Sequence, residues 1–217
     1  MTLKLVIGSK NYSSWSLRAW LALAHHKISF EEVLIPLDQP DTAARIRQYS
    51  PAGKVPILID GEAAVWESLA ILEYLNERFP QWQFWPKDPV ARAHARAIAT
   101  EMHAGFTALR RHCPMNLRRK KKRPLTPEVE ADVKQITAMW RGARERFGKG
   151  GEFLFGAFSA ADCMYAPVAT RFASYEIEAD PVSQAYINTI HGLPAFIAWR
   201  EAALQETWGH RATDAVA

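Results

Sequence analysis

The first eighty residues alternate between short aliphatic runs and stretches in which apolar side chains recur at helical spacing. Runs over Leu3–Ile7 and Phe30–Ile35 predict strands, and apolar positions three and four residues apart over 16–26 predict the helix between them. Asp41 is a favourable N-cap for a second helix that reaches Tyr49. This order of strand, helix, strand and helix predicts a small α/β unit.

A hairpin and a third helix complete this unit. Two short apolar runs, 57–59 and 63–66, flank the pair Asp60-Gly61, which is typical of a tight hairpin turn. Residues 67–79 then place their apolar side chains on one face of a predicted helix.

Beyond residue 80 the hydrophobic pattern has only helical periodicity. Residues 81–90 are rich in Trp and Pro and predict a boundary between an α/β domain of residues 1–80 and an all-helical domain of residues 88–217. The helices predicted in the second domain cover about 88–112, 127–147, 159–175, 182–191 and 194–205. The predicted fold class is therefore α/β plus all-α.

One of these helices begins with a capping signal. Ser159-Ala-Ala-Asp162 fits the capping-box pattern, with Asp in the place of the usual Glu. The two side chains are expected to satisfy free N–H groups of the first turn, so the carboxylate of Asp162 needs no catalytic role.

Composition narrows the class of protein. The chain has 217 residues, of which 48% are hydrophobic and 23% charged, which excludes a disordered or fibrous protein. Cys113 and Cys163 are far apart and fit neither a disulfide framework nor a metal site, so we expect two buried thiols and no bound metal. No run reaches the roughly 18 apolar residues of a membrane helix, and the first residues lack a signal peptide. We expect a cytoplasmic protein with no membrane partner.

Charge changes this picture little. The net charge is +4, and much of the basic excess lies in the run Arg118–Arg123, just before Pro124. Such a run is more often a solvated loop between helices than a phosphate-binding patch, so a nucleic-acid partner is not expected. His25 and His26 end a predicted helix, where the helix dipole favours a cation.

Four short motifs occur in a characteristic order: Ser13-Ser-Trp-Ser-Leu-Arg18, Lys54-Val-Pro56, Glu67-Ser68 and the box Ser159–Asp162. In this order and at these separations the chain resembles the cytosolic glutathione transferase family over nearly its whole length. The first motif is similar to the Ser-Ser-Cys-x-x-Arg segment of the zeta class. The resemblance implies a thioredoxin-like N-terminal domain followed by an all-helical C-terminal domain.

Glutathione reacts as its thiolate, so a protein that uses it must lower the pKa of the thiol. A serine hydroxyl and the start of a helix both stabilise a thiolate, and Ser13 and Ser14 are placed to provide them. A zeta-like alignment makes Ser13 the activating residue and a theta-like alignment makes it Ser14; either serine also suits a simple helix cap. Trp15 stands where the zeta class has cysteine, which argues against zeta-type isomerase activity and against thiol transfer.

The resemblance also assigns groups that would hold glutathione. Val55, before a cis proline at Pro56, would pair with the cysteinyl part through its backbone, and Lys54 would reach the glycine carboxylate. Ser68 would bind the γ-glutamyl carboxylate and Glu67 the ammonium group. Read without the resemblance, these residues equally suit a strand entry and an ordinary helix start.

An electrophilic acceptor would lie among Tyr12, Trp15 and, from the first long helix of the second domain, His103. The resemblance implies a homodimer that conjugates glutathione, its substrate, to small electrophiles in detoxification. Glutathione-dependent isomerisation or peroxide reduction would use the same thiolate. A further alternative is a non-catalytic interaction module on the same scaffold, in which the run Arg118–Arg123 would suit an anionic partner.

Overall fold

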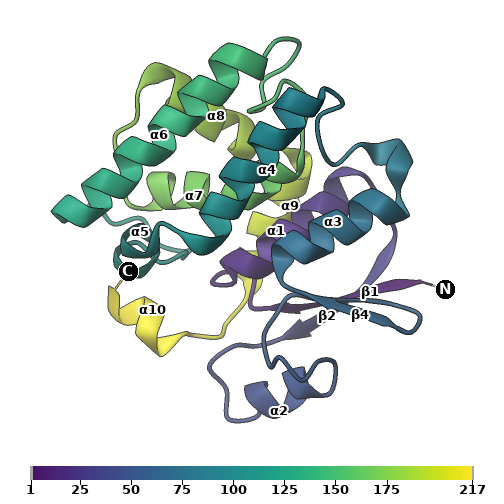
Figure 1. Ribbon diagram of the computed structural model, residues 1–217. Coiled ribbons are helices and arrows are strands. Elements are labelled where there is room, and N and C mark those ends of the chain that lie inside the picture. Colours follow the sequence, from purple (N-terminus) through teal and green to yellow (C-terminus); the bar gives the residue numbers. More distant parts are fainter. Residues whose placement is uncertain (1, 217) are drawn as a thin grey trace.

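The computed structural model describes residues 2–216 and begins with a four-stranded sheet (Figure 1). The elements of this part are β1 (Leu3–Gly8), α1 (Ser14–His25), β2 (Phe30–Ile35), α2 (Thr42–Arg47), β3 (Ile57–Asp60), β4 (Ala63–Trp66) and α3 (Ser68–Arg78). The strand order is β2-β1-β3-β4, with β2 parallel to β1, and β3 antiparallel to both β1 and β4. This is the thioredoxin-like arrangement that the resemblance implies.

The central strand explains why its sequence is continuously apolar. Leu5, Val6 and Ile7 of β1 have no exposed surface, because helices cover both faces of the sheet. Leu5 and Ile7 face the main core, which includes side chains of α1 and α3, whereas Val6 packs in a smaller cluster with Ile46 of α2. Alternate side chains of a strand point to opposite faces, so one run supplies both cores.

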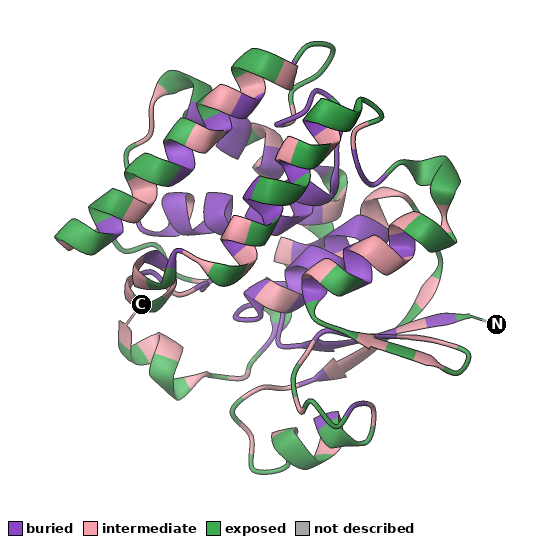
Figure 2. Ribbon diagram, viewed as in Figure 1, coloured by how far each residue is buried: buried purple, intermediate pink, exposed green. Residues whose placement is uncertain are grey.

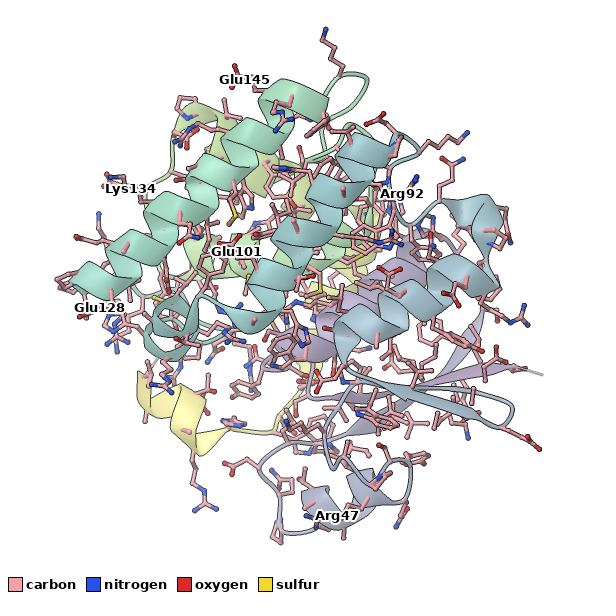
Figure 3. The ribbon with its side chains drawn as sticks, in the orientation of Figure 1. Arg47, Arg92, Glu101, Glu128, Lys134 and Glu145 are labelled. Atoms are coloured by element: carbon pink, nitrogen blue, oxygen red, sulfur yellow. The ribbon has the colours of Figure 1, made fainter. Side chains whose placement is uncertain are left out.

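The rest of the chain is helical. After a 3₁₀ turn, η1 (Pro80–Trp82), come α4 (Pro89–Ala104), α5 (Thr107–His112), α6 (Pro127–Phe147), α7 (Ala160–Ser174), α8 (Pro181–Gly192), α9 (Pro194–Gln205) and α10 (Arg211–Val216). α7 is buried on all sides except at Ala173 and packs against α1, α4 and α8 (Figure 2). The predicted capping box is present at its start. On the outer side of the helical part, Glu101 of α4 accepts a hydrogen bond from Gln135 of α6, and Glu128, Lys134 and Glu145 mark the solvent side of α6 (Figure 3).

One helix prediction is wrong and one helix was missed. The single helix expected over 88–112 is divided, because Gly105 leaves the helical conformation and Phe106 has a left-handed φ of 53°. The Phe106 side chain is buried in the core, and this burial offsets the strained backbone. α10 was not predicted.

His25 and His26 also differ from expectation. Burial lowers the pKa of both rings, to about 4 for His26, whose ring packs edge-on against Phe84. Loss of hydration therefore outweighs the favourable helix dipole, and both side chains are neutral at pH 7.

The effect of burial on a histidine pKa can be tested at His191. Burial and the nearby charges of Arg200 and Lys120 lower its pKa to about 4, and its ring stacks on Phe196. As the pH falls from 7 to 4.5 the unfolded chain protonates this histidine and the folded chain does not, so the folded state loses about 2–3 kcal/mol. His191→Phe keeps the stacking and should remove this part of the pH dependence. The measurement is the free energy of unfolding in urea across this pH range, and equal slopes for the two proteins would contradict the prediction.

Candidate functional site

A cleft of about 1030 Å³ lies between the sheet-containing part and the helical part. Its walls bring together most of the predicted site residues: Tyr12, Ser13, Ser14, Trp15, Lys54, Val55, Pro56, Glu67 and His103. The loop after β2, from residue 37 to 40, and residues of α2, α5, α7 and α10 also line it. The cleft therefore has one wall from each part of the chain.

Ser13 and Ser14 lie side by side at the start of α1, but their hydroxyls have different surroundings. Ser13 is the N-cap, and its Oγ accepts the N–H of Ser16 at 3.3 Å and lies 2.7 Å from Oγ of Ser16. The Oγ of Ser16 also accepts the N–H of Gly8 at 3.0 Å. Within residues 2–216, the hydroxyl of Ser14 has no hydrogen-bond partner although its side chain is largely buried. In the structure the hydroxyl of Ser13 donates its proton to Ser16, and both serines line the cleft.

The loop before β3 forms the next part of the wall. The Val55–Pro56 peptide bond is cis, as the resemblance implies. Pro56 is buried while Lys54 is exposed at the cleft, where a long flexible cation can reach a carboxylate.

Glu67 has the most unusual backbone of the site. It caps α3 with φ 68° and ψ 123°, a region that a residue with a side chain rarely adopts. Its carboxylate Oε2 lies 3.7 Å from Nε2 of His103, which comes from α4, and the His103 ring meets Trp15 edge-on at 5.2 Å. Backbone strain of this kind costs about 1–3 kcal/mol and is concentrated at functional sites.

Ser68 does not lie in the cleft wall. Its side chain has no exposed surface, and its hydroxyl faces Sδ of Met164 at 3.8 Å. Only its backbone N–H, at the first turn of α3, remains as a group for a bound carboxylate.

Three neighbouring arginines, two of them against the Trp15 ring, form a positive cluster that the sequence did not reveal. Arg18 is fully buried with its guanidinium 4.2 Å from the Trp15 ring centre; it donates to the carbonyls of Met164 and Ser14. Arg110 lies 5.5 Å from the same ring, and Arg171 donates to the carbonyl of Cys113.

None of these three side chains has an ion pair with a carboxylate among the described residues. Burial and the neighbouring Arg110 lower the pKa of Arg171 to about 10. Arg110 and Arg171 line the cleft, which makes this end of it attractive to an anion.

The C-terminal segment closes one side of the cleft. The Tyr12 hydroxyl lies 3.0 Å from both carboxylate oxygens of Asp214, and Asn116 donates to the same carboxylate at 3.1 Å. Arg118 donates to the hydroxyl of Tyr12 and to the backbone carbonyl of Glu206. His210 and Thr213 of this segment are in the cleft wall.

These contacts correct the expectation for the basic run. Residues 118–123 do form a loop between α5 and α6, and Lys120–Lys122 are exposed. However, Arg118, Arg119 and Arg123 donate to backbone carbonyls of the segment that includes α10. Half of the run is therefore a docking site for the chain's own C-terminal segment.

We expect Asp214→Ala to loosen the C-terminal segment without unfolding the protein. It removes hydrogen bonds to Tyr12, to Asn116 and to the N–H of His210, each worth about 1 kcal/mol. Amide hydrogen exchange over 207–216 should become about ten- to a hundredfold faster, while exchange in α7 stays unchanged. Asp38→Ala, which removes a contact of the more exposed Arg211, is the control and should have a smaller effect.

The structure was also searched for a metal site and for a membrane-spanning helix. No group of three or more His, Cys, Asp or Glu side chains within residues 2–216 is arranged to hold a metal ion. In the same part of the chain, no helix combines the length and apolar character that crossing a bilayer requires.

Comparison with known proteins agrees with the fold. The model of the glutathione S-transferase N-terminal domain matches residues 12–78, and that of the glutathione S-transferase C-terminal domain matches residues 126–202. A crystal structure of a glutathione transferase homologue from Burkholderia with bound glutathione superposes with a TM-score of 0.72 at 19% identity, covering 95% of this chain and all of that one. A theta-class enzyme from Xanthomonas axonopodis pv. citri, also with glutathione bound, gives 0.68 at 20% identity, covering 94% and 99%.

Among curated proteins, the chain is 30% identical over 200 residues to a probable maleylacetoacetate isomerase from Caenorhabditis elegans, covering 90% of this chain and 92% of that protein. Glutathione S-transferase Z1 of Arabidopsis thaliana is 34% identical over 98 residues, covering 44% of this chain and 42% of that protein. The two domain models together with a relative that matches almost end to end show that the chain belongs to the cytosolic glutathione S-transferase family.

Proposed function

We propose that this protein is a glutathione transferase that activates the thiol with a serine hydroxyl and conjugates it to a small electrophile. The observation that carries the proposal is the position of Ser13 and Ser14. They lie at the first turn of α1, in one cleft wall with Lys54, Val55 and Glu67. Glutathione carries a thiol, two carboxylates and an ammonium group. This wall offers a partner for the thiol, for one carboxylate and for the ammonium group, and the backbone N–H of Ser68 behind it is the partner for the second carboxylate.

The reaction needs little from the protein beyond charge stabilisation. The bound thiol loses its proton to solvent, and the thiolate is held by a serine hydroxyl and by the partial positive charge of the α1 N-terminus. The sulfur then forms a bond to an electrophilic carbon. The displaced electron pair leaves with a leaving group or takes up a proton from water. The helical wall would hold the electrophile against Tyr12 and Trp15.

We favour Ser13 over Ser14 as the activating residue. A hydroxyl that accepts a hydrogen bond on its oxygen is held in one orientation and donates its own proton more strongly. The Oγ of Ser13 accepts the N–H of Ser16, whereas the Oγ of Ser14 has no such partner among the described residues.

The remaining groups would position the tripeptide. The backbone of Val55 would pair with the cysteinyl unit, and Lys54 would bind the glycine carboxylate. Glu67, held near His103, would receive the ammonium group. The N–H of Ser68 would bind the γ-glutamyl carboxylate, because its hydroxyl is turned to Met164.

A second candidate function is glutathione-dependent isomerisation of an organic acid. Two features favour it: the relative described as a probable maleylacetoacetate isomerase, and the positive charges of Arg110 and Arg171 in the cleft. Isomerisation regenerates glutathione and conjugation consumes it. Free thiol measured during turnover of an unsaturated carboxylic acid therefore separates the two functions.

We also propose a cytoplasmic homodimer. Trp66 on β4 is 43% exposed. α4 packs beside α3 (Figure 1), and Ala93 and Ala97 are small exposed residues of α4. A large exposed aromatic side chain on one part of the chain and a helix with small exposed residues on the other suit a closely packed, self-complementary interface.

Sedimentation measures this directly. The wild type is expected to sediment as a dimer, and Trp66→Glu or Ala97→Glu as a monomer. Leu204→Glu changes an equally exposed apolar residue on α9 and should leave the dimer intact. A wild-type protein that sediments as a monomer at micromolar concentration would contradict the proposed homodimer.

The experiment that tests the function is a pH titration of the ultraviolet thiolate absorbance of glutathione bound to the protein. The wild type should show a thiolate at neutral pH, and Ser13→Ala should lose it while Ser14→Ala keeps it. If glutathione does not bind, or binds with the thiol pKa of free glutathione, the interaction module becomes the better account.

A further inference from the structure

Ser16 is the fourth residue of the serine-rich motif and contributes nothing to the cleft surface. Its side chain has no exposed area, and its hydroxyl lies between the backbone of Gly8 and the hydroxyl of Ser13. It accepts the N–H of Gly8, the last residue of β1, and its oxygen is 2.7 Å from Oγ of Ser13.

The hydrogen bonds of these two hydroxyls have two possible arrangements. A hydroxyl has one proton and two acceptor positions, and it rotates to suit its partners. In the structure, Ser13 donates to Ser16. With a thiolate present, Ser13 can turn its proton to the sulfur, and Ser16 can then donate its own proton back to Ser13.

The second arrangement leaves no group unsatisfied. The Oγ of Ser16 still accepts the N–H of Gly8, at 3.0 Å, and now donates to Ser13. The Oγ of Ser13 accepts from both the N–H and the hydroxyl of Ser16, so both of its acceptor positions are filled. Its proton then has a single remaining direction, into the cleft. Chained hydrogen bonds of this kind polarise one another, which strengthens the last donor.

We propose that Ser16 is a positioning residue that directs the hydroxyl proton of Ser13 to the glutathione thiolate. The proposal rests on the proposed function, in which Ser13 stabilises that thiolate. On this proposal, Ser16 lowers the pKa of the glutathione thiol without contacting it.

A purely structural role of Ser16 would affect the stability of the fold but not the pKa of the bound thiol. The bond from Gly8 joins the end of β1 to the first turn of α1, so Ser16→Ala is expected to destabilise the fold whether or not Ser16 orients Ser13. Ser9 provides a matched control. It is also fully buried and also accepts a backbone N–H, from Leu37, but its hydroxyl does not contact that of Ser13.

The test measures the thiol pKa of bound glutathione in Ser16→Ala, Ser9→Ala, Ser13→Ala and the double variant Ser13→Ala/Ser16→Ala. We expect Ser16→Ala to raise the thiol pKa by roughly 0.5–1 unit with less than threefold change in glutathione affinity. Ser9→Ala should leave the pKa unchanged. In the Ser13→Ala background, the second substitution should add no further shift, because the hydroxyl that it orients is gone.

Each failure has its own signature. If the wild type does not lower the thiol pKa, or if Ser13→Ala has no effect, the proposed function or its choice of serine fails. If both hold but Ser16→Ala behaves like Ser9→Ala, Ser16 is only structural. A shift that persists undiminished in the Ser13→Ala background overturns the proposal in the same way.

Discussion

Replacing Ser13 with alanine is expected to lower kcat/KM for conjugation at pH 7 by about 10- to 100-fold, while KM for glutathione changes little. The reason is the loss of one oriented hydrogen bond to the thiolate, which lowers the fraction of bound glutathione that is ionised. The helix N-terminus and the groups that hold the tripeptide remain, so binding persists. Steady-state kinetics with a chromogenic electrophile measures the effect.

The loss in this variant should shrink as the pH rises. Above the raised thiol pKa the bound glutathione ionises without help, so the rates of the variant and the wild type converge toward pH 9. Ser14→Ala is the matched control and should stay within about threefold of the wild type at pH 7. A large loss in Ser14→Ala with a small loss in Ser13→Ala would reassign the activating residue.

The largest effect on stability is expected at Asp162. Its carboxylate is fully buried and accepts the N–H of Leu154 at 3.2 Å and both the N–H and the hydroxyl of Ser159, at 2.8 and 2.9 Å. Burial raises its pKa to about 6 although these bonds favour the charged form. Asp162→Ala leaves three buried donors without an acceptor, so we expect the free energy of unfolding to fall by about 3–4 kcal/mol.

Urea unfolding with far-ultraviolet circular dichroism measures this loss. Ser159→Ala removes only the other half of the capping box and should cost about 1 kcal/mol. Asp162→Asn keeps an acceptor oxygen of the same size and should lie between the two. Equal losses for Ser159→Ala and Asp162→Ala would mean that the carboxylate does no more than cap α7.

The alternation of short apolar runs with helical spacing predicted β1, β2, β3 and β4 to within one residue of their ends, together with the box at Ser159. These features depend on residues a few positions apart, so the sequence displays them directly. The bounds of helix α9 were predicted for the same reason, since Pro194 can begin a helix but not continue one.

The sequence also determined which residues to inspect at the candidate site. The motif containing Ser13 and Ser14, the Val55–Pro56 pair and Glu67 were recognisable from their order, and the fold brings them to one cleft. Their order alone could not reveal that the side chain of Ser68 turns away to Met164, because Met164 lies about a hundred residues further along the chain.

What only the tertiary structure decided involves contacts between residues far apart in the sequence. The break between α4 and α5 has one local signal, Gly105, but the left-handed backbone of Phe106 depends on the burial of its side chain among residues distant in the sequence. Arg18, Arg110 and Arg171 come from three separate helices, and they form one positive cluster only because α1, α5 and α7 bring the three side chains close together.

The position of the C-terminal segment also depends on contacts between residues far apart in the sequence. The run at Arg118 resembles a solvated loop until the chain end returns to it, and Asp214 meets Tyr12 across about two hundred residues. The order of polar and apolar residues along the sequence predicts whether a residue is buried and where an element begins and ends, because these features depend on neighbours in the chain. This order does not predict which distant side chain packs against a buried residue. Many side chains of the same polarity could do so, and only the packing of the whole chain selects one.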